Sequence, residues 1–381
     1  MNKEIEQFLL NKGAIKVGFA TRETMKSDIP STDITYILPE ATSAICFAVP
    51  LDKEKIRAFL RKDMPNGHRQ HEKDNLDTYV KIMKITEATV DFLKEKGHEA
   101  KGIIPNLTYR DEYPEAPFRA RPRISLRYLA VRSGVGTFGW SGNVGIKDFG
   151  GPILLGGLVT TTNLTATDPI PKSESHCDRC KLCTKVCAYR MFSDNKEIAV
   201  NIGGQDFKYS NRINITRCLL VCGSYTGLDK TERWSTWCPE RFPYPETDDD
   251  LYETFGKCLK IQMSFPIRGE GEGVDRKQFF RDRVVKKVLR GENNTKYAFS
   301  TLNITCGNCH LICWGDPKET AENFRLLTNS GCTVRDKEGY IEVKSWEEAK
   351  AYPENNIMDI NREISPKRKG IVKWIREINE S

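Results

Sequence analysis

The sequence lacks long apolar runs and recognisable export signals. No stretch stays apolar for the roughly 18 residues that a transmembrane helix needs. The first ten residues predict an acidic amphipathic helix rather than a basic region followed by an apolar stretch, and no twin-arginine pair precedes the cysteine-rich part. We therefore expect a cytoplasmic protein with reduced thiols and no membrane span.

Internal repeats and a strong excess of one charge are missing as well. No unit of roughly 20 to 50 residues recurs, so a repeat architecture is not expected. The net charge of +7 is modest for 381 residues and does not require an acidic partner. Two local basic runs, Arg276 to Arg290 and Pro366 to Gly370, leave contact with a nucleic acid such as tRNA possible. The length suits one large domain or two ordinary domains.

What the sequence does have is grouped cysteine. Cys177, Cys180, Cys183 and Cys187 follow each other at C-x2-C-x2-C-x3-C spacing. This spacing lets three thiolates converge on one iron–sulfur cube, while the fourth reaches a second cube. The first run therefore predicts a partner run further along the chain.

The partner run is Cys306, Cys309 and Cys313, at C-x2-C-x3-C spacing. Two cubic clusters need eight thiolates and the two runs supply seven, so one isolated cysteine must complete the set. The spacing leaves five candidates. They are Cys218, Cys222, Cys238, Cys258 and Cys332.

Two other uses of grouped thiols fit less well. Zinc takes ligands in pairs around one tetrahedral ion, and a grouping of four plus three leaves ligands over. Disulfides need an oxidising compartment, which the absence of an export signal does not favour. We therefore predict two [4Fe–4S] clusters.

The first half of the chain predicts an α/β layer fold. Residues 3–12 and about 74–96 have helical patterns, each followed by a glycine, whereas 14–20 and 150–161 have the composition and patterning of strands. The apolar run at 43–50 is typical of a strand covered on both faces, and Cys46 within it predicts a buried small side chain.

A glycine-dense stretch comes between these elements. Gly134, Gly136 and Gly139 have G-x-G-x-x-G spacing, but a dinucleotide site requires that pattern to follow a strand and open a helix. Here the glycines close a helix and lead into a loop. Their density instead predicts backbone lying close to something flat or bulky.

A polar, aromatic loop follows residue 105 and is a candidate source of protons. Tyr109 is the preferred donor, with Tyr113, Asp111 and Glu115 as rivals. A phenol donates well where a cation stabilises its phenolate, and Arg110 or Arg121 would do so. The alternative is an ordinary surface excursion.

The order of these pieces resembles a known superfamily. Leu129-Ala-Val-Arg132 with its glycines, Gly139-Trp-Ser-Gly-Asn143, the first cysteine run, a lone Arg217-Cys218 and the last cysteine run follow one another. This series is similar to the cobalamin-dependent reductases that comprise epoxyqueuosine reductase and the reductive dehalogenases.

The resemblance implies a fold of class α/β (α+β): a nitroreductase-like corrinoid-binding domain followed by a ferredoxin-like double-cluster domain. The expected ranges are 1–168 for the first domain, 169–330 for the second with an insertion at about 222–305, and 331–381 for a C-terminal extension.

The resemblance also implies the ligands. Cys177, Cys180, Cys183 and Cys313 would hold one cluster, and Cys187, Cys218, Cys306 and Cys309 would hold the other. Gly139, Gly142 and Asn143 match the loop that approaches the corrinoid, a cobalamin.

Departures from epoxyqueuosine reductases direct the functional prediction. Those enzymes carry an acidic proton donor about where this chain reads Ile104-Pro105 or Ala120-Arg121, and Leu-Gly-Glu where it reads Leu155-Gly-Gly157. We therefore predict a reductive dehalogenase-like enzyme that takes electrons from an external ferredoxin or flavodoxin and reduces a small organic substrate. The alternatives are an epoxyqueuosine reductase acting on tRNA and a corrinoid-free electron-transfer protein.

Overall fold

The structure is a computed structural model, and it describes residues 1–105, 108–113, 121–223, 225–264, 306–335 and 341–352. The basic runs at 276–290 and 366–370 lie outside these residues. Among the described helices, none is long and apolar enough to cross a bilayer.

The first half is built on a four-stranded sheet. Its strands are β1 (Lys16–Thr21), β2 (Ser43–Pro50), β6 (Ile153–Thr160) and β3 (Ala100–Ile103), in the spatial order β1-β2-β6-β3. Every pairing is antiparallel, and Cys46 of β2 lies opposite Gly157 of β6. β3 forms one edge of the sheet.

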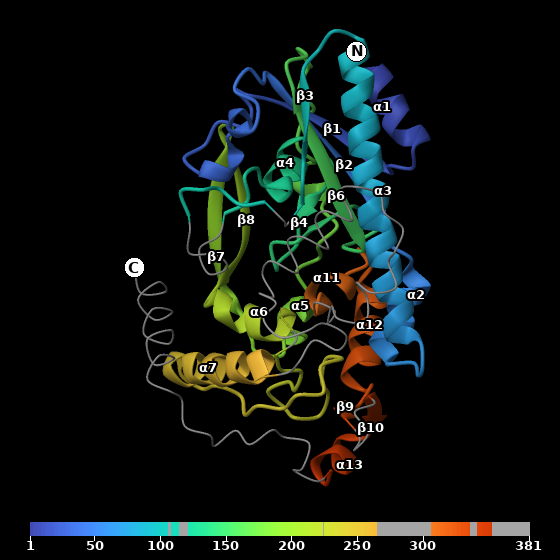
Figure 1. The fold of residues 1–381 in the computed structure, drawn as a ribbon, viewed down its shortest axis with the longest axis vertical. Coiled ribbons are helices and arrows are strands. Elements are labelled where there is room, and N and C mark those ends of the chain that lie inside the picture. The colour runs from blue at the N-terminus through green and yellow to red at the C-terminus, as the bar shows by residue number, and fades with distance from the viewer. Residues whose placement is uncertain (106–107, 114–120, 224, 265–305, 336–340, 353–381) are drawn as a thin grey trace.

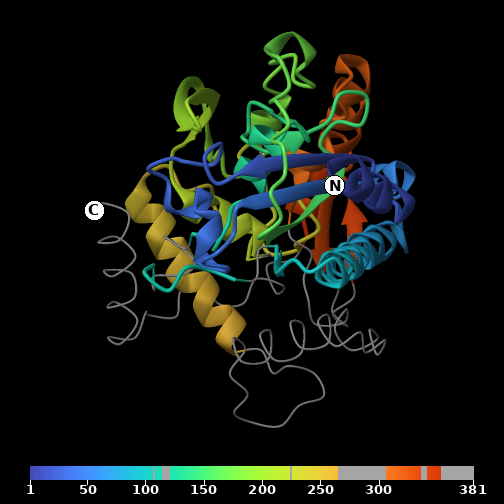
Figure 2. The ribbon, with the colours of Figure 1, turned by 90° about the horizontal axis from the view of Figure 1, so that it is seen from above.

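Helices cover both faces of this sheet (Figures 1 and 2). α1 (Asn2–Asn11) and α3 (Gly67–Glu95) pack on one face through side chains such as Leu9 and Ile82. α4 (Leu126–Arg132) packs on the other through Leu129 and Val131. Burial on both faces explains why β2 is a continuous apolar run, with seven of its eight residues buried.

These elements confirm the α/β prediction. The predicted strand 43–50 has its predicted bounds, and Gly97, with φ of 82°, follows the end of α3. α3 begins earlier than predicted, at Gly67, and β3 was not predicted because its four residues are too short to show a pattern.

The second half contains helices of 4 to 17 residues, one long hairpin and one further two-stranded sheet. α5 (Leu182–Lys185) leads into the hairpin β7 (Phe192–Ile202) and β8 (Gln205–Arg212). The remaining described elements follow in chain order. They are α6 (Ile215–Cys222), α7 (Asp248–Ser264), α11 (Asn308–Leu311), α12 (Pro317–Thr328), β9 (Cys332–Arg335), β10 (Ile341–Lys344) and α13 (Trp346–Lys350).

The two halves share a core through α2 (Lys53–Arg61). Phe59 and Leu60 of α2 are buried with Trp237 and Trp314 of the second half, and the Trp237 indole N–H donates to the Phe59 carbonyl at 3.0 Å. Each half therefore needs the other to bury its apolar surface. The predicted domain limits remain predictions, and α2 is a segment of the first range that packs with the second.

Candidate iron–sulfur centre

The first cysteine run gathers with the last cysteine of the chain's second run. Cys177 and Cys180 precede α5, and Cys183 lies within it. Cys313 follows α11, which packs against α5 (Figure 1). One small cavity is lined by thiols from both runs, namely Cys177, Cys180, Cys183, Cys309 and Cys313. This group, without Cys309, is the predicted first set.

The C-x2-C segments that precede α5 and α11 share one backbone feature. Lys181 lies between Cys180 and Cys183 with φ of 59°, and Gly307 lies between Cys306 and Cys309 with φ of 60°. Each of these residues has a left-handed backbone conformation, follows a cysteine and is the N-cap of the next helix, α5 or α11. A non-glycine residue rarely adopts this conformation, so its use at Lys181 indicates a constrained turn.

A second group of thiols lies beside the first. Cys187 and Cys309 lie near enough to Cys218 of α6 to oppose its ionisation, and Cys309 does the same for Cys306. The four cysteines predicted for the second cluster therefore gather. Cys309 also borders the cavity of the first group, so the two groups are adjacent.

Burial governs the protonation of these thiols. It raises the pKa of Cys187 to about 11 and the pKa values of Cys309 and Cys313 to about 12. It also raises the pKa of Cys183. At neutral pH such thiols keep their protons unless a metal displaces them, so cluster assembly must release protons.

The loop Gly139–Asn143 donates hydrogen bonds to three of the cysteines. The Trp140 amide donates to Cys177 Sγ at 3.3 Å, and the Ser141 amide donates to Cys183. The Asn143 side-chain amide donates to Cys309 Sγ at 3.3 Å. Hydrogen bonds to ligand sulfurs are among the features that set cluster potentials. The loop thus connects the sheet half to both thiol groups.

The glycines of this loop lie against the protein's own rings. A Cβ on Gly142 would come within 2.7 Å of the Tyr209 ring of β8, and one on Gly139 would come within 3.3 Å of the His176 imidazole. Arg127 fills more of this space, because its guanidinium donates to the Gly142 carbonyl. The predicted close approach of something flat is present, but the flat groups are side chains of this chain.

Gly142 is therefore covered in this arrangement, whereas the predicted corrinoid contacts of Gly139 and Asn143 stay predictions. Tyr209 and Arg127 cover Gly142, whereas Gly139 and Asn143 border the small cavity of the first thiol group, where the Asn143 amide donates to Cys309 Sγ. The Tyr209 hydroxyl also lies 3.0 Å from the Tyr128 hydroxyl, which fixes the β7–β8 hairpin over this loop.

Two further glycines bring the second cysteine run onto the sheet half. A Cβ on Gly150 would lie 2.2 Å from the Trp314 backbone, and one on Gly151 would lie 2.5 Å from the His310 carbonyl. The Gly151 amide also donates to the Cys313 carbonyl. Residues with side chains would separate Cys313 from β6, so these glycines hold the two halves in contact.

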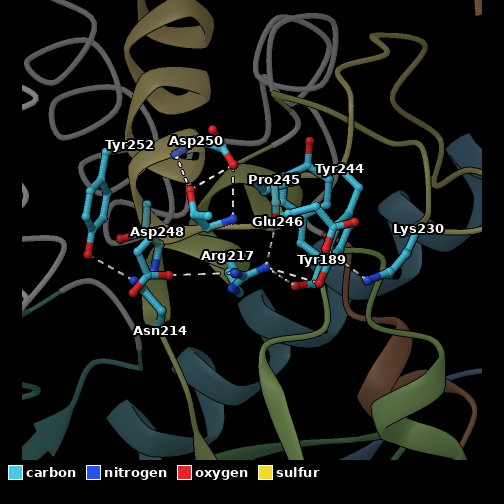
Figure 3. A network of polar contacts seen from close by, with 12 residues as sticks. Tyr189, Asn214, Arg217, Lys230, Tyr244, Pro245, Glu246, Asp248, Asp250 and Tyr252 are labelled. Carbon is cyan, nitrogen blue, oxygen red and sulfur yellow. Dashed lines mark hydrogen bonds and ion pairs between the residues drawn. The ribbon is translucent and has the colours of Figure 1, made fainter.

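Arg217 anchors the helix that carries Cys218 (Figure 3). Its guanidinium is buried and donates to the Tyr189 carbonyl, the Tyr244 hydroxyl at 3.1 Å and the Pro245 carbonyl. It also lies 3.6 Å from an Asp248 carboxylate oxygen. Arg217 thus ties α6 to the segment before α7, which fixes the position of the thiols on α6.

The predicted proton donors lie on a separate loop. Burial raises the pKa of Tyr109, and the Arg121 guanidinium lies 5.5 Å from the Tyr113 ring centre. Arg110, predicted to stabilise a phenolate, instead binds Glu112 and stacks over the Tyr36 ring at 3.9 Å. Glu115 lies outside the described residues.

A cavity of about 760 Å³ lies at the β3 edge of the sheet beside this loop. Tyr36, Ile104, Asp111 and Arg123 contribute to its lining. The size is typical of small-molecule pockets. Of the predicted donors, Asp111 borders it.

One feature of the site was missed from the sequence, and a second was left among several candidates. The Trp140 and Ser141 amides that donate to cysteines have no sequence signal, because any residue supplies an amide. Cys222 was one of five candidates for the eighth ligand, and its i, i+4 spacing from Cys218 places both on one face of α6.

Among the described residues, no three His, Cys, Asp or Glu side chains converge as ligands of a single metal ion. The ligands of a cubic cluster each bind a different iron and are spread around it.

Comparison with known proteins gives one sequence relative. No family model matches the chain. An epoxyqueuosine reductase of Atelocyanobacterium thalassa (isolate ALOHA) is 25% identical over 176 residues, which are 46% of this chain and 51% of that protein. The match thus spans about half the length of the curated relative.

Solved structures of two kinds are similar at low identity. A crystal structure of epoxyqueuosine reductase with an epoxyqueuosine-modified tRNA-Tyr stem loop has 14% identity and a TM-score of 0.43, and the match covers 100% of this chain and 99% of that one. The catabolic reductive dehalogenase NpRdhA, in complex with 3-bromo-4-hydroxybenzoic acid, has 11% identity and a TM-score of 0.43, with 81% and 37% covered. The sequence relative is one of the two reductase kinds that the motifs resemble, which confirms the predicted resemblance.

Proposed function

We propose that this chain, a relative of the epoxyqueuosine reductases, is an oxidoreductase that carries two [4Fe–4S] clusters. The observation that supports this most directly is the gathering of its two distant cysteine runs into two adjacent thiol groups. Single electrons from an external ferredoxin or flavodoxin would enter one cluster and pass to the other.

The chain's own residues prepare the site for this role. Cys183 and Cys306 are buried, Cys180 is exposed, and groups of the loop Gly139–Asn143 donate to the sulfurs that face the sheet half. Such hydrogen bonds stabilise the added negative charge of a reduced cluster, so they favour reduction. A cluster pair supplies one-electron chemistry, and the protein orients the acceptor.

We propose that the substrate is a modified nucleoside of tRNA, in preference to an organohalide. The sequence relative is an epoxyqueuosine reductase, whereas the support for a dehalogenase comes from the departures at Ile104-Pro105 and Gly157. The cavity beside Asp111 is the proposed place of the reacting group, and Asp111 would supply the proton. Neither Tyr109 nor Tyr113 is among the residues that line this cavity.

Metal content tests the core of the proposal. Protein purified or reconstituted without oxygen should contain about eight irons and eight sulfides, and reduction should produce the electron paramagnetic resonance signal of two interacting clusters. Iron near zero after reconstitution, or zinc in its place, would refute the proposal.

Substrate class is tested separately. Reduced protein should convert epoxyqueuosine in tRNA, and binding of that tRNA should weaken steeply with salt. Conversion of bromophenols without activity on tRNA would favour the dehalogenase alternative instead.

Cobalamin titration tests the remaining prediction from the resemblance. Because Tyr209 and Arg127 cover Gly142, we expect no cobalamin to bind at that loop. A base-off cobalt signal would mean that the β7–β8 hairpin moves away from it.

A further inference from the structure

Tyr36 contacts the loop that carries Asp111 at the cavity beside β3. Both residues contribute to the lining of that cavity of about 760 Å³. The Tyr36 hydroxyl accepts the Asp111 backbone N–H at 3.0 Å. The backbone of Asp111 is therefore bound directly to a side chain from a distant part of the chain.

Tyr36 is itself firmly held. It ends η2 (Ile34–Tyr36), a short 3-10 helix whose N-cap residue, Asp33, accepts a backbone amide at 2.9 Å. Ile34 and Leu38, on either side of Tyr36, are buried in the core of the sheet half. A side chain on such a rigid segment can fix the position of a loop, because its own movement is small.

Glu112 and Arg110 orient the Tyr36 hydroxyl. The hydroxyl donates to Glu112 Oε2 at 3.2 Å, which leaves its lone pairs to accept the Asp111 amide. Arg110 donates to the other carboxylate oxygen, Oε1, at 2.9 and 2.6 Å. The buried Arg110 guanidinium also stacks on the Tyr36 ring, 3.9 Å from the ring centre. The hydroxyl thus has a fixed direction, with a lone pair toward the Asp111 amide.

Fixing a surface loop would explain only part of this network. Arg110 alone would fix the loop, because it also donates to the Pro30 carbonyl at 2.8 Å. The Tyr36 hydroxyl adds a contact to position 111, and of the predicted donors in the described residues Asp111 is the one that borders the cavity. A proton donor must stay within hydrogen-bond reach of the reacting atom, so a contact that fixes its backbone affects the rate.

We propose that Tyr36 is a positioning residue, which holds Asp111 at the cavity through its hydroxyl. This inference rests on the proposed function, in which Asp111 supplies the proton. The O–H of Tyr36 is directed to Glu112 and transfers no proton to the substrate. Loss of the hydroxyl should therefore slow the reaction while leaving substrate binding and cluster content unchanged.

The first test is Tyr36→Phe in the full-length protein with both clusters reconstituted, assayed on tRNA that contains epoxyqueuosine. The variant keeps the ring under Arg110 and removes only the hydroxyl. We expect kcat to fall about 10-fold, with KM within about twofold of the wild type and about eight irons retained. Tyr352→Phe, which removes a hydroxyl beside β9 in the second half, is the matched control and should leave kcat unchanged.

A double variant separates positioning from a general loss of structure. Asp111→Asn should lower kcat about 100-fold, because the proton donor is lost. Adding Tyr36→Phe to it should lower kcat no further, since the hydroxyl then has no donor to position. A second 10-fold loss in that background would show that Tyr36 acts elsewhere and would overturn the inference.

Amide hydrogen exchange tests the contact without any substrate. The Asp111 amide should exchange about 10-fold faster in Tyr36→Phe than in the wild type, because its acceptor is lost. Unchanged exchange, or an unchanged kcat, would overturn the inference even if the wild type is active. A wild type that holds its clusters but converts neither the tRNA nor bromophenols would instead refute the proposed function, so the two failures are distinguishable.

Discussion

Asn143 couples the sheet half to the second thiol group through one hydrogen bond. Its amide donates to Cys309 Sγ at 3.3 Å. In Asn143→Ala this bond is lost, and the negative charge of the reduced cluster is less stabilised. A net hydrogen bond of about 1 kcal/mol corresponds to a potential roughly 40 mV more negative for a one-electron couple. Redox titration of the reconstituted protein checks this, with Asn211→Ala on β8 as the control. An unchanged potential would mean that Asn143 does not act on the cluster.

Gly142 is required by space as well as by backbone conformation, and Gly204 separates these two effects. Their φ angles are 74° and 76°, but a Cβ would meet the Tyr209 ring at 2.7 Å only at Gly142, since nothing lies within 4 Å at Gly204. Both alanine variants should lose about 1 to 2 kcal/mol of unfolding free energy from the left-handed conformation. Gly142→Ala should lose about 1 to 3 kcal/mol more from overpacking. Urea unfolding measures both, and equal losses would show that Tyr209 does not press on Gly142.

At the scale of elements, α6 is held by a buried arginine. Arg217→Ala removes charged donors from two carbonyls and the Tyr244 hydroxyl, and should lower the unfolding free energy by about 3 kcal/mol. The pair with Asp248 adds little, because that carboxylate is 53% exposed. The second cluster should be lost in part, so iron falls below eight. Arg325→Ala, which breaks an exposed pair with Glu322, should change neither quantity. Full iron content in Arg217→Ala would show that α6 is positioned without it.

Elements with a long periodic pattern were predictable, and their partners were not. β2 and α3 follow from apolar runs and helical spacing within a single segment. The spacing within each cysteine run likewise predicted which thiols gather. The partner of Gly142 is Tyr209, 67 positions further along the chain, and nothing local to either residue indicates that they meet. For this reason a close approach at Gly142 was predictable from the density of glycine, but Tyr209 as the approaching group was not.

At the scale of the whole molecule, the chain crosses between its halves several times. α2 follows the sheet strand β2 but packs with the second half. Gly150 and Gly151 lie against the backbone of Cys313 and Trp314. The thiol groups lie where these crossings meet, so separation of the halves would disassemble the site. We therefore expect unfolding and cluster loss to occur together.

Lys62 is a buried, charged side chain that joins the end of α2 to the second half. It follows α2, is 3% exposed, and its ammonium donates to Ser330 and to the Gly331 carbonyl. Burial lowers the pKa of Lys62 to about 7, while neighbouring Cys332 and Asp229 oppose that shift. Unfolded lysine keeps its proton up to a pKa of about 10.4, so above pH 7 the unfolded state binds more protons than the folded state. Lys62 thus makes stability rise with pH above 7.

The pH dependence of Lys62→Met tests this reasoning. Between pH 7 and 9 the unfolding free energy of the wild type should gain about 2 to 3 kcal/mol relative to the variant, and below pH 6 the difference should stop changing, because lysine is protonated in both states. Urea unfolding at each pH provides the measurement. Taking the difference cancels the titration of the thiols, which is common to both proteins. Lys318→Met on α12 replaces an exposed lysine and should follow the wild type at every pH. Parallel curves for wild type and Lys62→Met would mean that Lys62 reaches water in the folded protein, and that the contact between α2 and the turn at Ser330 is looser than the structure shows.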